Sequence, residues 1–459
     1  MLELLGEHGL TTPHLVLLVV ALLAACGFEF INGFHDTANA VATVIYTKTL
    51  KPQVAVLYSG LLNFCGVFLG GIAVALAIIK LLPVELLVDG GTGRGMAMVF
   101  ALLVSAMLWN FGTWYLGLPA SSSHTLIGSI LGVGLASSLL AGHFGEGVNW
   151  GKAMDVGLSL LVSPLVGFGL AALVLKIMRA VVKDRRVFLP PDDTEKTPPR
   201  WVRAVLILTC GGVSFAHGSN DGQKGVGLIM LILVGLLPAQ FALHAAATPE
   251  QMKAAHVAAQ HARATFEARC PADPHACAAV EALTKAEGAL ANETSVAALS
   301  EDERWQVRQA VLLADDAAKN LDDTEAFAAD RAALGGLTDY APWWVLLMVA
   351  LSLGIGTTVG WKRIVVTVGE KIGKSHLTYA QGASAELVAM STIGFSSFLG
   401  LPVSTTHVLS SGIAGTMATE GSGIQAGTVK KIALAWILTL PASMLLAGVL
   451  FVVFEKLAS

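Results

Sequence analysis

Asn32-Gly-Phe-His-Asp-Thr-Ala-Asn39 interrupts a long apolar run near the start of the chain. It places the carboxylate of Asp36 between residues 15–31 and 40–45, which are almost all compatible with lipid. An ionisable side chain at such depth is costly and marks a functional site by default. The stretch His217-Gly-Ser-Asn-Asp-Gly-Gln-Lys-Gly225 repeats the pattern around Asp221. Two interrupted apolar segments of this kind predict a transporter built from repeats.

The composition is that of a helical membrane protein. Of the 459 residues, 54% are hydrophobic and 14% are charged, whereas a soluble chain carries about 25% charged residues. The runs at 204–216 and 408–418 are too short to cross a bilayer alone, so we expect half-helices or re-entrant segments there. The candidate spans lie near 14–31, 53–82, 96–115, 124–142, 154–178, 204–216, 226–243, 342–361, 378–398, 408–418 and 432–454.

Two segments do not belong to the membrane. Residues 183–203 are charged and Pro-rich, which is typical of a linker. Residues 244–340 are polar, Ala-rich and acidic, and the spacing of their apolar residues predicts a small insertion of amphipathic helices. We therefore divide the chain into a first membrane repeat at 1–182, a cytoplasmic linker at 183–203, a second membrane repeat at 204–243 and 341–459, and the insertion at 244–340.

Basic residues set the predicted orientation. Positive charges cluster in the linker, and Lys48 and Lys51 follow the first motif, so both loops are expected in the cytoplasm. If the two halves are inverted, the insertion and the N-terminus lie on the outer side.

A second pair of motifs indicates an internal duplication. Leu116-Gly-Leu-Pro-Ala-Ser-Ser-Ser-His124 matches Leu399-Gly-Leu-Pro-Val-Ser-Thr-Thr-His407. The two copies of this motif are separated by more residues than the two acidic motifs are. The difference between the two separations equals the length of the 244–340 segment to within one residue, so the insertion accounts for it. The predicted fold class is an all-α, multi-span membrane protein of two inverted repeats, with broken or re-entrant helices and a polar helical insertion.

The hydroxyl residues of the second motif pair are candidate ligands for an anion. Gly and Pro end one helix, and the hydroxyls then stand at the start of the next, which we expect from residues 125 and 408 onward. Free N–H groups at helix N-termini bind anions, so two such ends meeting near the midplane would surround a tetrahedral oxyanion. The alternative is that each hydroxyl only caps its own helix. The six residues are Ser121, Ser122, Ser123, Ser404, Thr405 and Thr406.

Asp36 and Asp221 cannot attract an anion by charge. We expect them to hold a proton or a cation that travels with the anion; the alternative is a structural role as caps of broken helices. Asn39 and Asn220 could add polar contacts, and Lys224 could pair with Asp221 or reach the anion.

Other ionisable side chains also lie in apolar surroundings. His35, His124 and His407 stand at the motif edges, where they could relay protons or pack as neutral rings. We favour a function for Glu386, which has Gln381 nearby. The sequence does not decide the role of Glu29.

Cys270 and Cys277 lie within the insertion. Their Cys-x4-His-x-Cys spacing could bind a metal, but it matches no familiar zinc pattern. A disulfide is favoured if the segment lies outside the cytoplasm.

At both motif pairs the sequence resembles the inorganic phosphate transporter (Pit) family, in particular its bacterial low-affinity branch. The resemblance runs through residues 32–45, 117–128, 217–225 and 400–407 and covers nearly the whole membrane part. It implies a secondary transporter rather than an enzyme, with phosphate held between inverted repeats. The residues that it assigns to phosphate are Asp36, Asn39, Asn220, Asp221 and the six hydroxyl residues.

The sequence departs from the family pattern at two positions. His35 replaces an amide, and Asn63 stands near the position of a Glu in sodium-coupled members. The resemblance therefore implies coupling to protons, and phosphate carried together with Mg²⁺ or another divalent metal ion that Asp36 and Asp221 would hold. The coupling residues expected on this basis are Asp36, Asp221, Glu386, His35 and Gln381.

The expected protein is a multi-pass symporter of the bacterial inner membrane. Its expected partners are the lipid bilayer and inorganic phosphate, with no nucleic acid and no cofactor, and a homodimer is left open. The alternatives are sodium coupling, another oxyanion such as sulfate, a carrier whose main cargo is a divalent metal, a passive channel, and a membrane enzyme or sensor built on the insertion.

Overall fold

The computed structural model describes residues 12–79, 93–142, 144–145, 148, 150–191, 198–291, 293–318, 321, 325–421 and 423–458. The chain divides into two compact units. The larger unit comprises residues 21–81, 97–228 and 343–459, and the smaller unit comprises residues 1–20, 82–96 and 229–342.

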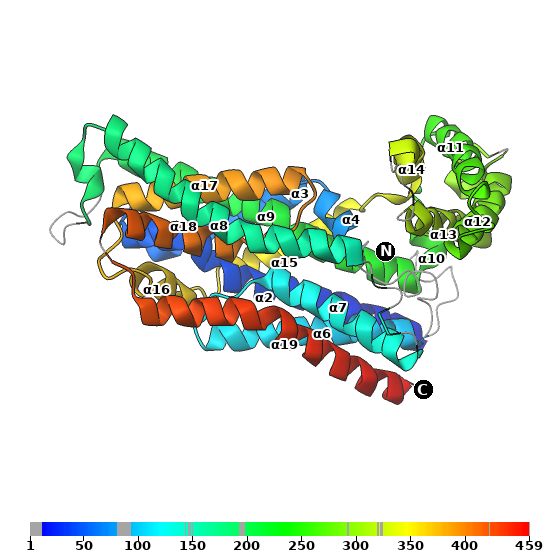
Figure 1. The fold of residues 1–459 in the computed structure, drawn as a ribbon, viewed down its shortest axis with the longest axis horizontal. Helices are drawn as coiled ribbons and strands as arrows, with labels where there is room; N and C mark the ends of the chain where they lie inside the picture. The colour runs from blue at the N-terminus through cyan, green and yellow to red at the C-terminus, as the bar shows by residue number, and fades with distance from the viewer. Residues whose placement is uncertain are drawn as a thin grey trace. The chain divides into compact units, whose positions relative to one another are not determined.

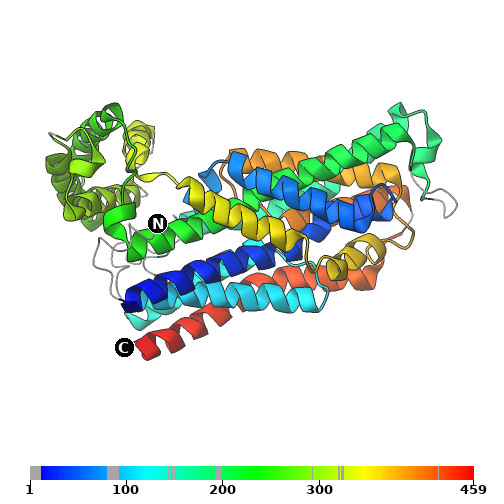
Figure 2. The same ribbon diagram turned by 180° about the vertical axis from the view of Figure 1, so that it is seen from behind.

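The described elements are helices, followed along the chain in Figures 1 and 2. The first half contains α2 (Thr12–Tyr46), α3 (Pro52–Leu69), α4 (Ala73–Ile79), α6 (Gly93–Tyr115), α7 (Ser122–Leu140), α8 (Trp150–Val181) and the 3-10 helix η1 (Arg185–Phe188). The second half contains α9 (Arg200–Leu236), α15 (Trp343–Thr357), α16 (Lys362–Glu370), α17 (Tyr379–Phe398), α18 (Thr405–Glu420) and α19 (Ala426–Ala458). Between α9 and α15 lie α10 (Pro238–Phe241), α11 (Pro249–Glu267), α12 (Pro274–Leu290), η2 (Val296–Ala298), α13 (Glu301–Ala317) and α14 (Glu325–Thr338).

The described helices follow one order in both halves. A long helix is followed by two shorter ones, then by a pair joined by a short connection, and finally by a long helix that contains a proline. The prolines are Pro164 in α8 and Pro441 in α19. This order agrees with the predicted duplication, while the inversion of one half relative to the other stays a prediction.

Seven of the described helices are long and apolar enough to cross a membrane, judged by length and composition. They are α2, α3, α6, α7, α9 and the segments Ala153–Val181 of α8 and Ala426–Leu457 of α19. The prediction of an all-α, multi-span membrane protein is confirmed. Residues 80–82 of the run expected at 53–82 lie outside the described residues.

The helices α2 and α9 run without interruption through the two acidic motifs. The prediction that the chain breaks at these motifs is therefore wrong. The run at 204–216 is the first part of α9 rather than a half-helix, and α9 continues to Leu236 through most of the run expected at 226–243. The motif glycines instead permit close packing. A Cβ atom on Gly33 would lie 2.4 Å from the carbonyl oxygen of Leu353, and one on Gly218 would lie 2.2 Å from that of Asn63.

The expected breaks are present at the second motif pair. Gly117 and Gly400 adopt φ angles of +67° and +68°, a conformation that favours glycine. Helices α7 and α18 then begin at Ser122 and Thr405, three residues earlier than expected. The hydroxyl residues therefore stand at helix N-termini, as predicted.

Helix pairs that join the two halves dominate the larger unit. The most extensive contacts are those of α7 with α19, of α8 with α18 and of α3 with α15. Glycine lets backbones approach in these pairs, as is common between membrane helices. A Cβ atom on Gly132 of α7 would lie 2.0 Å from the carbonyl oxygen of Met444, and one on Gly415 of α18 would lie 2.2 Å from that of Phe168.

The insertion is helical, as predicted, and has its own apolar core in the smaller unit. Thr248 and Ser300 form capping boxes that start α11 and α13. Arg308 of α13 is buried and donates a hydrogen bond to the carbonyl oxygen of Thr338 at 2.8 Å. Burial lowers the pKa of its guanidinium.

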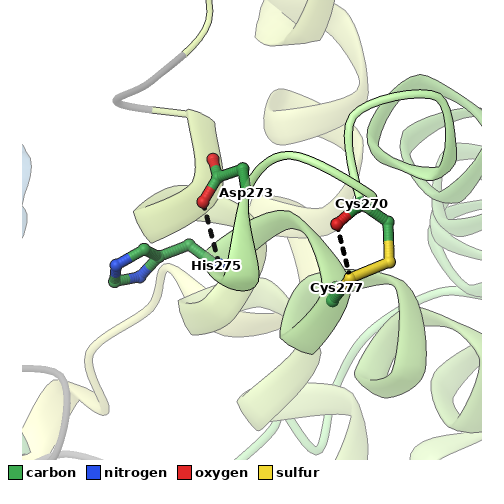
Figure 3. The surroundings of a disulfide bond; sticks show 4 residues. All are labelled: Cys270, Asp273, His275 and Cys277. Atoms are coloured by element: carbon green, nitrogen blue, oxygen red, sulfur yellow. Dashed lines mark hydrogen bonds between the residues drawn. A yellow bond between two sulfur atoms is a disulfide. The ribbon is translucent and has the colours of Figure 1, made fainter.

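Cys270 and Cys277 form a disulfide within the insertion, shown in Figure 3. It connects the segment after α11 to the first turn of α12, whose start is capped by Asp273 accepting from the His275 backbone N–H at 2.9 Å. The disulfide is thus confirmed, and both sulfur atoms are withdrawn from the metal site that their spacing also allowed. The side of the membrane on which the insertion, the linker and the N-terminus lie stays a prediction. Residues 1–11 and 192–197 lie outside the described residues.

We predict that Gly33→Ala lowers the free energy of unfolding by about 1–3 kcal/mol, because the new methyl group meets backbone atoms that cannot turn away. The control is Gly169→Ala in α8, where a Cβ atom meets nothing within 4 Å. That change should leave stability equal or raise it by up to about 1 kcal/mol. Thermal unfolding of the purified proteins in detergent measures both. Equal melting temperatures for the two variants would contradict the packing role of Gly33.

We predict that maleimide labelling of the denatured protein gives three labels before reduction and five after it. The three free thiols are Cys26, Cys65 and Cys210, and reduction releases the other two. Mass spectrometry of protein isolated from the membrane counts the labels. Five labels without reduction would place Cys270 and Cys277 in a reducing compartment and contradict the outer location expected for the insertion.

Candidate functional site

The two motif carboxylates meet inside the larger unit. The Oγ atom of Ser122, at the start of α7, lies 2.9 Å from Asp36 Oδ2 and 3.1 Å from Asp221 Oδ2. Asp36 and Asp221 are 2% and 0% exposed. Motifs on α2 and α9, which are distant in the chain, therefore form a single buried site.

Asp36 is contacted from both halves of the chain. Thr406, in the first turn of α18, donates to Asp36 Oδ1 at 2.7 Å. The Nδ1 atom of His35 lies 3.0 Å from the same oxygen. Asn39 donates to Thr406 Oγ1 at 2.8 Å and lies 3.5 Å from Asp36 Oδ1. The hydroxyl tip of α18 is thereby tied to the first acidic motif.

Asp221 forms a buried ion pair. Lys224 Nζ lies 2.7 Å from Asp221 Oδ1, and both side chains are almost fully buried. Lys224 also donates to the hydroxyl of Ser123, which in turn donates to the carbonyl oxygen of Val403 at 2.9 Å. Removing one partner of such a pair leaves an uncompensated charge in the interior, which is strongly destabilising.

His217 belongs to the site, although it is not among the site residues predicted from the sequence. Its Nε2 atom lies 3.9 Å from Asp36 Oδ2 and 3.5 Å from Asp221 Oδ2, and its Nδ1 atom lies 2.9 Å from Asn63 Oδ1. One ligand atom each of Asp36, His217 and Asp221 lies within 4.8 Å of the others. Carboxylate oxygens and an imidazole nitrogen are suitable ligands for a divalent metal ion. The signal available in the sequence is the spacing of four residues between His217 and Asp221, which places them on one face of α9.

The hydroxyl residues divide into two groups. Ser122, Ser123 and Thr406 join the polar contacts around the carboxylates, as described above. Ser121 and Ser404 are N-caps that accept from the backbone N–H groups of His124 at 3.2 Å and His407 at 3.1 Å. For these two residues the structure shows the capping role. Thr405 is buried as the first residue of α18.

Asn220 contacts the backbone rather than the carboxylates. Its Nδ2 group donates to the carbonyl oxygen of Leu401 at 3.1 Å, and its Oδ1 atom accepts from the N–H group of Val403 at 3.4 Å. It therefore holds the connection between α17 and α18 against α9.

Glu386 and Gln381 lie apart from the paired carboxylates. Glu386 is fully buried and accepts hydrogen bonds from Thr43 of α2 and Thr209 of α9. Thr43 is seven residues beyond Asp36, or about 10 Å along the helix. Gln381 accepts from the backbone N–H of Thr378 at 2.9 Å in the capping box that starts α17.

The rings of the other two motif histidines pack against each other at a tilt of 35°. The rings of His124 and His407 have centroids 4.6 Å apart, and His407 lies 4.1 Å from the ring of Trp436. This geometry agrees with the packing alternative. His35, by contrast, links Asp36 to Thr113, whose Oγ1 atom lies 3.1 Å from His35 Nε2.

Comparisons with known proteins agree with this architecture. The chain is 43% identical to the low-affinity inorganic phosphate transporter PitA of Escherichia coli K12, over 98% of this chain and 99% of the relative. It is 42% identical to PitB of the same organism, over 95% and 96%. A probable low-affinity inorganic phosphate transporter of Bacillus subtilis is 27% identical over 96% and 98%.

A solved structure, described as the sodium-dependent phosphate transporter, matches with a TM-score of 0.55 at 21% identity. The match covers 96% of this chain and 99% of that one, and at this identity it shows a shared fold alone. Residues 32–447 match the model of the phosphate transporter family. That span includes both motif pairs and most of the membrane helices, and the chain belongs to the phosphate transporter family.

Proposed function

We propose that this protein imports inorganic phosphate across the bacterial inner membrane as a proton-coupled symporter, and that phosphate enters together with a divalent metal ion. The observation that carries the proposal is the hydroxyl of Ser122 shared between the carboxylates of Asp36 and Asp221. It joins the acidic motifs and a hydroxyl-rich helix tip in one buried site.

The anion would be held by the N-termini of α7 and α18. Backbone N–H groups of the first turn lack partners within the helix, and the helix dipole favours negative charge there. Ser122, Ser123 and Thr406 lie at these two ends and already donate hydrogen bonds inside the site. A hydroxyl hydrogen rotates at little cost, so the same groups can donate to phosphate oxygens instead.

The charge of the site supports a cation as co-substrate. Ser122 has one hydroxyl hydrogen and can donate to only one of the two carboxylates at a time. Lys224 offsets one negative charge, so the second carboxylate and an arriving phosphate leave an excess of negative charge. A divalent metal ion between Asp36, Asp221 and phosphate would offset this excess, with His217 as a nitrogen donor.

Glu386 is the coupling residue that we propose in addition to Asp36 and Asp221. Its hydroxyl partners Thr43 and Thr209 stand on α2 and α9, the two helices that carry the acidic motifs. A change in the charge of Glu386 therefore acts on both helices. Sodium coupling is the alternative, because Glu386 and these two hydroxyls also offer the oxygen ligands that Na⁺ takes. His35 touches Asp36 directly, and Gln381 supports the helix that carries Glu386.

We predict that the protein in proteoliposomes accumulates radiolabelled phosphate under an imposed pH gradient, acid outside, and that a protonophore collapses the uptake. An imposed Na⁺ gradient alone should give no accumulation. Uptake should also rise when Mg²⁺ is added, and sulfate in tenfold excess should leave it unchanged. Accumulation driven by Na⁺ at constant pH would replace proton coupling with the sodium alternative, and competition by sulfate would widen the substrate to other oxyanions.

We predict that Asp36→Asn and Asp221→Asn each lower phosphate uptake by at least about thirtyfold, since losing one member of a buried, hydrogen-bonded charge set costs about 2–5 kcal/mol. Initial rates in proteoliposomes measure the effect. The control is Asp155→Asn, which changes an exposed carboxylate of α8 and should keep the parental rate. Size-exclusion profiles establish that the variants are folded. Parental uptake by either site variant would contradict the assignment of the paired carboxylates.

A further inference from the structure

Helix α2 carries a line of buried polar side chains that extends beyond the paired carboxylates. They recur every three or four residues and therefore share one face of the helix. The line covers about 20 Å of helix. Asp36 stands at its middle, Thr43 contacts Glu386 at one end, and Glu29 forms the other end. All are at most 2% exposed: Glu29, Asn32, Asp36, Asn39 and Thr43.

Glu29 is fully buried and short of hydrogen-bond donors. Asn32 Nδ2 lies 3.4 Å from Glu29 Oε2. Within the described residues, Glu29 Oε1 and Asn32 Oδ1 have no hydrogen-bond partner. Two neighbouring acceptor oxygens without a donor are costly in a buried position, and the cost is greatest when the carboxylate is ionised.

The side chain of Glu29 is pressed against the backbone of α9. A Cβ atom on Gly225 would lie 2.4 Å from Glu29 Cγ and 2.7 Å from Oε1. Gly225 directly follows Lys224, the cation of the buried ion pair. The carboxyl of Glu29 therefore packs against the part of α9 that carries the proposed phosphate site.

The charged and titratable groups that act on Glu29 come from α9 and from its own helix, as far as the described residues show. Asp221, Lys224 and His217 of α9 interact with it electrostatically, and Cys26 stands on α2. Asp221 opposes a negative charge on Glu29, whereas Lys224 favours one. The proton affinity of Glu29 is thereby linked to the state of the Asp221–Lys224 pair.

We propose that Glu29 is a second proton-binding carboxyl of the transport cycle, an inference that rests on the proton-coupled phosphate transport proposed above. A proton from water on one side of the membrane forms an O–H bond at Glu29 Oε1. This oxygen had no hydrogen-bond donor, and once protonated it can itself donate. The negative charge of the carboxylate is removed at the same time. When the site opens to the other side, this O–H bond breaks and the proton returns to water there.

Glu386 differs from Glu29 in a way that supports this assignment. The carboxyl group of Glu386 has two hydroxyl partners, and a hydroxyl can donate to the ionised form or accept from the protonated form, so Glu386 has partners in either state. Glu29 Oε1, by contrast, has no donor among the described residues, and protonation removes the cost of leaving it charged there. The two buried carboxyls stand at opposite ends of the polar line on α2, with the phosphate site between them.

The test uses Glu29→Gln in the full-length protein reconstituted in proteoliposomes. Accumulation of phosphate under a pH gradient should fall at least tenfold, because the amide cannot carry the proton. Exchange of internal for external labelled phosphate at equal pH should stay within twofold of the wild type, because exchange requires no net release of a proton. Glu29→Asp should restore part of the accumulation. Glu281→Gln, at a 73% exposed side chain of the insertion, is the matched control and should change neither rate.

Two outcomes for Glu29→Gln would overturn the inference. Loss of exchange together with accumulation would show a structural or phosphate-binding role, and retention of both at wild-type rates would show no role in coupling. The wild-type protein reports separately on the proposed function. If it exchanges phosphate but does not accumulate it under a pH gradient, proton coupling itself fails, and the proposal for Glu29 fails with it.

Discussion

Two like charges held beside one hydroxyl group determine how the interior of this transporter is built. Asp36 and Asp221 both face Ser122 in a place without water exposure, where their mutual repulsion is poorly screened. The surrounding groups are donors or cations that oppose this repulsion, including His217 and Lys224. A site that already needs positive charge favours the joint uptake of phosphate and a cation that we propose.

The contacts around the carboxylates cross between the two halves of the chain. Asp36 of the first half accepts from Thr406 of the second, and Asp221 of the second half faces Ser122 of the first. Lys224 likewise reaches across to Ser123. Neither half could form this site alone. A change at either helix tip is felt directly by the carboxylate of the other half.

Much of this site could be predicted because its residues come in pairs. The duplicated Asp and hydroxyl motifs led to Asp36, Asp221 and the tips of α7 and α18, and composition alone indicated the membrane helices. The sequence did not distinguish a glycine that breaks a helix from one that admits a neighbouring backbone. Gly33 does the second, because Leu353 lies against it in the fold. His217 lies at the site because the fold brings α9 next to Asp36 of α2. No local sequence pattern predicts that contact between the two helices.

Backbone contact at single glycines also limits how the transporter can move. Gly132 ties α7 to α19, and Gly415 ties α18 to α8, with no side chain between the backbones that could adjust to sliding. Each hydroxyl-bearing helix is therefore packed closely against its long partner, which favours movement of the two helices as one unit. In the transport cycle that we propose, the site would open to each side in turn by the tilting of these two helix pairs about the charged centre.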